Sequence, residues 1–557
     1  MSIVLRWSYR KTPLSNTREN PKMPQRPIYL VAFLTTLVFS FPANAEDASR
    51  PNVLIAISDD QSWPHASAYG STLVNTPTFD RIAKEGVLFN NAFCASPGCS
   101  PSRAAFLTGR HTWQIEHAGT HASYFSTKYE TFPDRLEADG YFVGYTGKGW
   151  APGNFKISGR VRNPAGTTFS AKGKSRKDSQ YVASFHKFLD NRPEDRPFYF
   201  WFGSHDAHRS YEKGSGLAKG MTLAQATVPG FLPDSDEIRS DLLDYAFEVE
   251  RFDDDVAAML KMLEEIGELD NTLVIITSDN GMPFPRAKAN CYEYGIHMPL
   301  AIRWPDRVPG GRTVDDLVGF VDLTATIYDA TGVSAPSDPG LSGRSILGIL
   351  ESNKSGVVDT TRDAVYAARE RHSSSRYNSL SYPQRCIRTA QYLYIRNFTP
   401  ERWPAGTPEK YGKAKFNEAG ELVSAQPGRA HGGYHDIDAC PSLDFLIQHH
   451  DHPDWGKFLG LSVDKRPAEE LFDVVSDPDC LHNLAGQTRY TAVKEQLAKR
   501  LLNYLRKTED PRVTGNGDIW ETYPRVSSLR WFPVPDWAKS NPEQIPVQDW
   551  LEERRPH

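Results

Sequence analysis

Cysteine, net charge and long apolar runs are all scarce in this chain of 557 residues. Its six cysteines are dispersed and form no Cys-x-x-Cys pair, which excludes a disulfide scaffold and gives no indication of a zinc site. The net charge of -5 supplies no global basic field, so we expect no nucleic-acid partner, and local cations must hold any anionic ligand. No internal repeat stands out. With 39% hydrophobic residues the chain can bury one large core and a smaller second one.

An apolar stretch at residues 28–41 bears on where the protein resides. It follows two basic side chains and precedes Ala43-Asn44-Ala45, the small-x-small pattern of a cleavage site. Because the stretch is too short to span a bilayer stably, we expect a signal peptide over residues 1–45, and a retained membrane anchor is the alternative. Met23 is a second candidate start of translation. We therefore expect an exported protein, periplasmic or secreted, or lysosomal in a eukaryote.

Residues 46–384 alternate strand-like and helical segments, which is typical of an α/β fold. The segment 52–58 contains an uninterrupted apolar run, as found in strands buried on both faces of a parallel sheet. We predict a doubly wound domain whose ligands gather at the carboxyl ends of its strands. Further strands are expected at 142–146, 198–203 and 272–278, and helices at 78–85, 132–139 and 241–263.

The sequence changes in character near residue 384, where we place the start of a second domain over residues 385–557. Residues 386–398 alternate like one antiparallel strand, and residues 490–507 have a helical pattern. Much of the segment between them is rich in Gly, Pro and charge. These features predict a smaller C-terminal α+β domain that carries an antiparallel sheet.

The most informative run is Cys99-Ser100-Pro101-Ser102-Arg103, which Thr108-Gly109-Arg110 follows. A thiol just ahead of a proline sits where a helix begins, and the free N–H groups and positive dipole end there favour a bound anion. Arg103 shares a helix face with the thiol. The pattern therefore predicts an anion site beside a cysteine, and a buried structural cysteine is the alternative.

Two of the predicted strands end in polar doublets. Asp59-Asp60 follows the strand 52–58, and Asp279-Asn280 follows the strand 272–278. Four oxygen donors that converge at strand ends, with neither His nor Cys among them, suit a hard cation such as Ca²⁺ or Mg²⁺. Each doublet alone is also common at helix caps and turns.

Cations and histidines follow the same strands. Lys148 sits between two glycines that let a ligand approach the backbone, and a solvated loop lysine is its alternative interpretation. Lys288 and Arg286 lie in the loop after the second doublet, where either could reach the same anion. His205 and His208 close the strand 198–203 and are spaced so that they could ligate a metal.

The run from Cys99 to Arg110 resembles the signature of the type I sulfatases, in which the cysteine is converted to formylglycine. The resemblance extends from Asn52 to Ala485 and implies an alkaline-phosphatase-like, doubly wound mixed sheet, with the catalytic domain at 46–384. It also implies one Ca²⁺ per chain, a sulfated saccharide substrate and a formylglycine-generating or equivalent maturing enzyme as partner. A homodimer is compatible with it.

The same resemblance implies a role for each residue of these motifs. The cation and Arg103 polarise the hydrated aldehyde at residue 99, Asp279 is the base, and His208 protonates the departing oxygen or nitrogen. The two lysines bind the sulfate oxygens. The implied catalytic residues are Cys99, Arg103, Lys148, His208, Asp279 and Lys288, and the implied metal ligands are Asp59, Asp60, Asp279 and Asn280.

One position departs from the family pattern. Most relatives have a histidine two residues after the first active-site lysine, where this chain has Trp150. An indole donates one hydrogen bond and cannot accept a proton. His121 or His111 would have to take that place.

The loop from Asp279 to Pro285 and the segment from His205 to Arg209 look most similar to the heparan N-sulfatase subgroup of the family. This resemblance implies an N-sulfoglucosamine substrate. The candidates for sugar binding are His121, His205, Arg286, Glu370, Arg371, His372 and Arg385, although a surface charge cluster is an equal interpretation of the last four.

Three other functions stay open at this point. One is an O-sulfatase that acts on another sulfated polysaccharide. Another is a phosphoryl-transfer hydrolase of the alkaline phosphatase superfamily, although Asn280 stands where its two-zinc members need a histidine. The third is a non-catalytic lectin, which requires that the aldehyde never forms.

Overall fold

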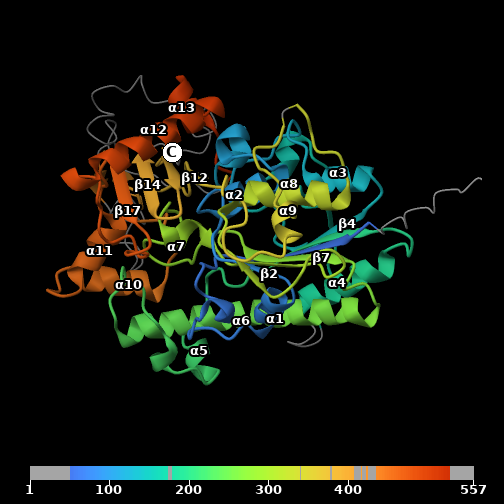
Figure 1. Ribbon diagram of the computed structural model, residues 1–557. Helices are drawn as coiled ribbons and strands as arrows, with labels where there is room; N and C mark the ends of the chain where they lie inside the picture. Colours follow the sequence, from blue (N-terminus) through green and yellow to red (C-terminus); the bar gives the residue numbers. More distant parts are fainter. Residues whose placement is uncertain are drawn as a thin grey trace, which may run out of the picture. The chain divides into compact units, whose positions relative to one another are not determined.

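A mixed eight-stranded sheet runs through the first two thirds of the chain in the computed structural model (Figure 1). Its middle is parallel: β1 pairs with β6 on one side and with β7 on the other, and β4 extends the parallel set beyond β6. β9 runs antiparallel to both β7 and β2. The strands in spatial order are β10 (Arg312–Val314), β2 (Val87–Phe89), β9 (Leu300–Arg303), β7 (Thr272–Ser278), β1 (Asn52–Ser58), β6 (Phe198–Gly203), β4 (Phe142–Gly147) and β5 (Thr167–Thr168).

Helices cover both faces of this sheet, because alternate residues of its central strands are apolar on opposite sides. Val53 and Ile55 of β1 face one core and Leu54 faces the other, and all three are fully buried. Figure 1 shows one helical layer above the sheet and one below it. The first layer contains α2 (Cys99–Thr108), α3 (Phe132–Ala138) and α8 (Phe320–Thr331), and the second contains α1 (Pro77–Glu85), α4 (Gln180–Asn191) and α6 (Asp236–Glu265). The doubly wound α/β prediction is confirmed.

A four-stranded antiparallel sheet belongs to the C-terminal part of the chain, as predicted. One face packs against α12 (Thr491–Lys507) through three buried leucines of that helix. The strands are β12 (Val365–Arg369), β13 (Gln384–Arg388), β14 (Tyr392–Asn397) and β17 (Glu469–Asp473). β12 therefore precedes residue 384, and the domain boundary placed there stays a prediction.

The segment 386–398 was expected to be one strand, and it is a hairpin of β13 and β14. Residue 389 ends the first strand, because its backbone N–H donates to the carbonyl oxygen of Tyr392 at 2.9 Å and turns the chain back. Alternation of side chains continues across a tight turn, so the pattern alone does not show the break.

Shorter elements complete the chain. A three-stranded sheet contains β11 (Val318–Gly319), β3 (Ala92–Phe93) and β8 (His297–Met298), and β15 (Lys415–Phe416) pairs with β16 (Leu422–Ser424). The short helices include α5 (Ser215–Ala218), α7 (Glu293–Ile296), α9 (Leu347–Leu350), α10 (Pro441–Gln448), α11 (Gly456–Val463), α13 (Pro511–Thr514) and α14 (Ile519–Thr522).

The structure describes residues 50–173, 179–338, 340–376, 379–406, 415–416, 422–424 and 434–526. The predicted signal peptide over residues 1–45 lies outside these ranges. Within them, no helix is both long enough and apolar enough to cross a membrane.

Candidate active site

The two polar doublets meet at the carboxyl ends of β1 and β7. The strands pair in register to their last residues, Ser58 and Ser278, so the residues that follow emerge side by side. The backbone N–H of Asp60 donates to Asp279 Oδ1 at 3.1 Å, and Asn280 Nδ2 donates to Asp60 Oδ1 at 2.7 Å. All four side chains of the doublets are buried. The structure thus brings the predicted oxygen donors together.

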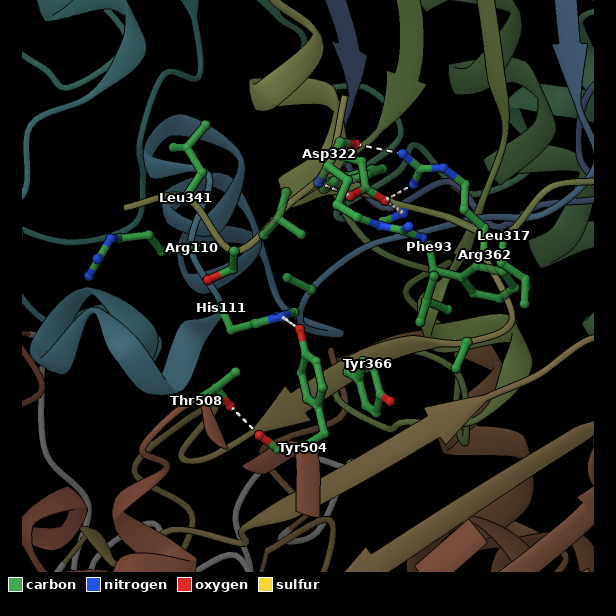
Figure 2. A pocket seen from close by; sticks show the side chains of 18 of the residues that line it. Phe93, Arg110, His111, Leu317, Asp322, Leu341, Arg362, Tyr366, Tyr504 and Thr508 are labelled. Carbon is green, nitrogen blue, oxygen red and sulfur yellow. Dashed lines mark hydrogen bonds and ion pairs between the residues drawn. The ribbon is translucent and has the colours of Figure 1, made fainter. Parts of the chain in front are cut away.

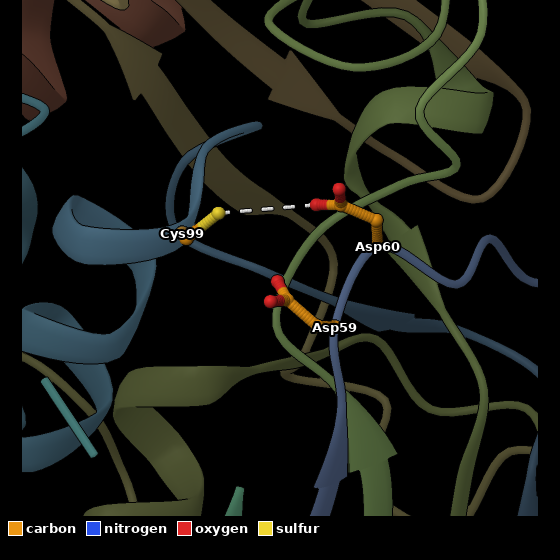
Figure 3. Close-up of side chains that lie close together, drawn as sticks. All are labelled: Asp59, Asp60 and Cys99. Atoms are coloured by element: carbon orange, nitrogen blue, oxygen red, sulfur yellow. Dashed lines mark hydrogen bonds between the residues drawn. The ribbon is translucent and has the colours of Figure 1, made fainter. Parts of the chain in front are cut away.

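Cys99 is the first residue of α2 and lies directly over this group of carboxylates. Its Sγ is 3.8 Å from Asp60 Oδ1, and Figure 3 shows the thiol pointing toward the two aspartates. The helix begins here because Gly98 is extended and Pro101 lies in the first turn, where its missing N–H costs nothing. Burial raises the pKa of the Cys99 thiol well above its usual range. As a thiol, residue 99 is therefore a poor nucleophile at neutral pH.

Arg103 is one turn further along α2 and is almost completely buried. Its Nε donates to Asp279 Oδ2 at 2.7 Å, and its Nη1 donates to the carbonyl oxygen of Lys148. Ser102 Oγ donates to the carbonyl oxygen of Asp279 at 2.6 Å. These contacts fix α2, the end of β7 and the loop after β4 as one rigid unit.

Two buried lysines neutralise the carboxylates. Lys148 Nζ lies 2.5 Å from Asp59 Oδ2, and Lys288 Nζ lies 2.6 Å from Asp60 Oδ2. Burial alone would raise the pKa of Asp59, but Lys148 and the neighbouring cations hold it well below its usual range. We call the following residues the reaction cluster: Asp59, Asp60, Cys99, Arg103, Lys148, Asp279, Asn280 and Lys288.

His208 stands at the edge of the reaction cluster. Its Nε2 is 3.8 Å from Asp60 Oδ2, and 35% of its side chain is exposed, so an incoming molecule can reach it. His208 and His205 both line a cavity of about 410 Å³. Burial lowers the pKa of His205, which makes it less suited to carry a proton at neutral pH.

Asp438 also lies in this site, although no pattern in the sequence indicates it. Its Oδ2 accepts from Lys288 Nζ at 2.8 Å, and 28% of its side chain is exposed. Its neighbour Asp436 is buried and pairs with Arg369 at 2.6 Å, which anchors the segment. Nothing in the local sequence separates this aspartate from the other acids of a Gly- and Pro-rich stretch, so only the folded chain identifies it.

The indole of Trp150 donates its Nε1 hydrogen to the carbonyl oxygen of Ser100 at 3.1 Å, so it supports the start of α2. His121 stacks on His372, with ring centroids 4.3 Å apart. A Cβ at Gly98 would lie 3.1 Å from His372 Nδ1, which places this histidine pair against the turn that precedes Cys99. The other candidate, His111, bonds to Tyr504 beyond the opposite end of α2.

The remaining sugar-binding candidates are held by ion pairs or by backbone carbonyl oxygens. Arg385 is fully buried and donates to Asp510 and to Glu370. Arg371 donates to the carbonyl oxygen of Tyr523 at 2.6 Å, and Arg286 donates to that of Leu461 at 2.7 Å. The structure therefore does not bring these guanidinium groups to the reaction cluster. We call the following residues the structural cluster: Glu370, Arg385, Asp510, Arg512 and Glu521.

The reaction cluster offers what a hard cation needs. Asp59 Oδ1 and Asn280 Oδ1 are buried acceptors without a hydrogen-bond partner, and the donor set consists of oxygen atoms. Ligand atoms of Asp60, His208 and Asp438 lie within 4.8 Å of one another, which is close enough for a second ion. The ammonium of Lys288 already lies within hydrogen-bond distance of both of these carboxylates, which disfavours a two-metal arrangement.

Two family models match the chain. The Sulfatase model matches residues 51–333, and a model described as N-sulphoglucosamine sulphohydrolase, C-terminal, matches residues 287–404. The chain belongs to the sulfatase family, and it is a sulfuric ester hydrolase.

Its relatives include N-sulphoglucosamine sulphohydrolase of Homo sapiens, which is 27% identical over 512 residues, 85% of this chain and 93% of that protein. An ulvan-active sulfatase of Formosa agariphila is 26% identical over 475 residues, 83% of this chain and 81% of that protein. A solved structure in complex with its substrate D-glucosamine-2-N,6-O-disulfate superposes with a TM-score of 0.58 and 19% identity, covering 83% of this chain and 98% of that chain. That structural likeness shows the shared fold.

Proposed function

We propose that the protein removes the N-sulfate group from a non-reducing-end glucosamine of a sulfated glycan, after conversion of Cys99 to formylglycine. The reaction type, sulfate hydrolysis from sugars, follows from the family. The observation that carries the proposal is the placement of Cys99, whose thiol lies 3.8 Å from an Asp60 carboxylate at the start of α2. The match of residues 287–404 to the N-sulphoglucosamine sulphohydrolase model supports the N-sulfate substrate.

A calcium ion fits the four oxygen-donor side chains, two of which carry acceptors without partners. When bound, it would offset negative charge on the sulfate oxygens, and the hydrated aldehyde at residue 99 would supply the nucleophilic hydroxyl. The proposed ligands are Asp59, Asp60, Asp279 and Asn280.

The protein's own side chains would bind the sulfate and move the protons. Lys148 and Lys288 each place a buried ammonium beside the carboxylates, where they can donate to the sulfate oxygens. Asp279, whose carboxylate is held by Arg103, would take up the proton of the attacking hydroxyl. His208, on the exposed side, would donate a proton to the departing nitrogen.

Two further residues complete this proposal. Asp438 gives Lys288 a second carboxylate partner, which keeps the ammonium in place if Asp60 shares its charge with the cation. His121 is the histidine that would take the place left by Trp150, because it lies with His372 against the turn before Cys99. Both assignments rest on position in the fold.

The chain is also proposed to be exported, with cleavage before Glu46, and to be matured by a formylglycine-generating or equivalent enzyme. N-terminal sequencing of the exported protein tests the first part. An intact Met1 or Met23 on exported protein would contradict it.

A panel of N-, 2-O-, 3-O- and 6-O-sulfated glucosamine saccharides tests the substrate. We expect sulfate release from the N-sulfated sugar, and none from any sugar with the Cys99→Ala variant. Release only from O-sulfated sugars would reject the N-sulfatase proposal and leave the family assignment intact. Equal release by the Cys99→Ala variant would reject the proposed role of residue 99.

A further inference from the structure

A second cavity has a volume of about 620 Å³, and Figure 2 shows it from close by. Arg110 and His111, just after the end of α2, line the cavity. A helix of this length rises about 15 Å from Cys99 to that end. Phe93 and Ala95, which precede Cys99, also line the cavity. Its walls also come from the start of α8, from β12 and from the end of α12. It contains no residue of the reaction cluster.

This cavity carries surplus positive charge. Its two acids are already paired: Asp322 with Arg362 at 3.0 Å, and Asp363 with Arg500 at 2.9 Å. Three further cations line it without an ion pair to any carboxylate in the described part of the chain, namely Arg110, Arg344 and Lys507. Because the whole chain has a net charge of -5, this surplus is a local feature.

One wall of the cavity is aromatic and rigid. The rings of Tyr366 and Tyr504 stack with their centroids 3.7 Å apart and their planes 1° apart. The Tyr504 hydroxyl is hydrogen-bonded to His111 Nε2 at 2.6 Å, as Figure 2 shows, which fixes this ring pair. Aromatic walls with a few placed polar groups are typical of pockets that bind organic ligands.

We propose that this cavity is a second binding site for an anionic saccharide unit of the sulfated glycan. The sulfate or carboxylate groups of the sugar would pair with Arg344, Lys507 and Arg110, and the ring would pack beside the tyrosine wall. An inorganic anion would leave the wall and most of the volume unused, and a neutral sugar would leave the cations unpaired. The ligand class rests on the proposed function.

A second site would increase the affinity of the enzyme for a polymeric substrate. A chain held at this cavity raises the effective concentration of its other units near the molecule, without a new contact in the active site. We therefore expect the cavity to lower KM for a long sulfated glycan and to leave KM for a monosaccharide unchanged.

Calorimetric titration of the inactive Cys99→Ala chain with a short sulfated oligosaccharide tests the proposal. Two binding events per chain are expected. Arg344→Gln/Lys507→Gln should weaken one of them by about tenfold, since each lost surface cation is worth roughly threefold to fivefold in affinity. The matched control Lys84→Gln/Lys261→Gln removes the same charge from exposed positions and should weaken neither event.

Ala364→Trp fills the cavity without a change in charge and should weaken the same event, so the test survives if the double variant fails to fold. One event in the parent chain, or two events unchanged in both cavity variants, would overturn the proposal. Binding of a neutral oligosaccharide to the cavity with the affinity of the sulfated one would also overturn it. Binding of inorganic sulfate alone with that affinity would do so too. The titration needs no turnover, so its outcome is independent of whether N-sulfate is the substrate.

Discussion

The reaction cluster and the structural cluster are both buried and rich in ion pairs, yet they differ in how their polar atoms are satisfied. In the structural cluster, Arg385 donates to Asp510 and Glu370, and Arg512 donates to Glu370 and Glu521. None of its side-chain nitrogen or oxygen atoms is a buried atom without a partner. In the reaction cluster, Asp59 Oδ1 and Asn280 Oδ1 have no partner at all.

This difference separates two uses of the same residue types. A buried acceptor without a partner costs about 1–3 kcal/mol, and a cation bound by Asp59 Oδ1 and Asn280 Oδ1 would remove that cost. A closed network gains nothing from a ligand and serves to hold strands and helices together. Two oxygen acceptors without a partner, on doublets that follow neighbouring strands, distinguish the reaction cluster from the structural cluster.

One substitution in each cluster should produce the largest effects, on turnover in the reaction cluster and on stability in the structural cluster. Asp279→Asn removes the carboxylate that Arg103 holds, and we expect turnover to fall by about a thousandfold. Arg385→Met should instead lower the free energy of unfolding by about 3–5 kcal/mol, because it leaves buried carboxylates without their partner. Steady-state kinetics and urea unfolding of both variants measure the two effects.

Turnover per folded molecule should be unchanged in Arg385→Met. A loss of turnover in this variant with an unaltered unfolding curve would show that the structural cluster contacts the substrate and would break the distinction.

Calcium should stabilise the protein through the reaction cluster alone. At a free concentration one hundred times its Kd, a bound ion adds about 2.7 kcal/mol to the free energy of unfolding. Asn280→Ala removes one acceptor without a partner and should reduce this gain, whereas Arg385→Met should retain it. Thermal unfolding with Ca²⁺ and with a chelator measures the shift. Stabilisation by Zn²⁺ in place of Ca²⁺ would contradict an oxygen-donor site.

Asp438→Asn should raise KM for the sulfated sugar by about tenfold, because Lys288 loses one of its two carboxylate partners. Sulfate inhibition should weaken in parallel, since the same ammonium is proposed to hold the anion. Asp438→Glu should restore part of the affinity, and the exposed Asp451→Asn should change neither quantity. Unaltered KM and sulfate inhibition in Asp438→Asn would remove Asp438 from the site.

A fall in pH should lower the stability that the structural cluster contributes. Burial alone would raise the pKa of Glu521, but Arg402 and Arg512 hold it well below its ordinary value of 4.5. A carboxyl with a lower pKa in the folded state stabilises the protein above that ordinary value, and this contribution is lost as pH falls through the folded pKa. Glu521→Gln should therefore make the loss of stability below about pH 4.5 shallower.

Urea unfolding at a series of pH values measures that slope. The exposed Glu495→Gln is the matched control, and it should retain the slope of the parent. An unchanged slope in Glu521→Gln would contradict the assignment.

Much of the reaction cluster could be predicted because most of its residues lie in a short motif or directly after a predicted strand. Asp59 and Asp279 each follow an apolar strand directly, so the strand pattern and the parallel sheet together bring them to one edge. The residues of the next helical turn, which include Pro101 and Arg103, identify Cys99 in the sequence.

Of the helices in the sheet layers, α1, α3 and α6 were predicted at about the right positions, whereas α4 and α8 were not predicted. The helix α6 begins earlier than expected because Ser235 caps it.

Residues that meet across long stretches of sequence could not be predicted. Asp438 reaches Lys288 from a stretch without a regular pattern. Arg385 and Glu370 were candidates for sugar binding because an exposed charge and a paired buried charge look alike in a sequence. Only the folded chain shows that Arg385 is fully buried and paired with Glu370 and Asp510.

The state of residue 99 tests the central claim most directly. Mass spectrometry of the tryptic peptide that contains residue 99, from protein made with a sulfatase-maturing enzyme, should show the mass of the aldehyde in place of the thiol. Sulfate release should rise in proportion to the converted fraction. An intact thiol in protein that releases sulfate at full rate would contradict the account.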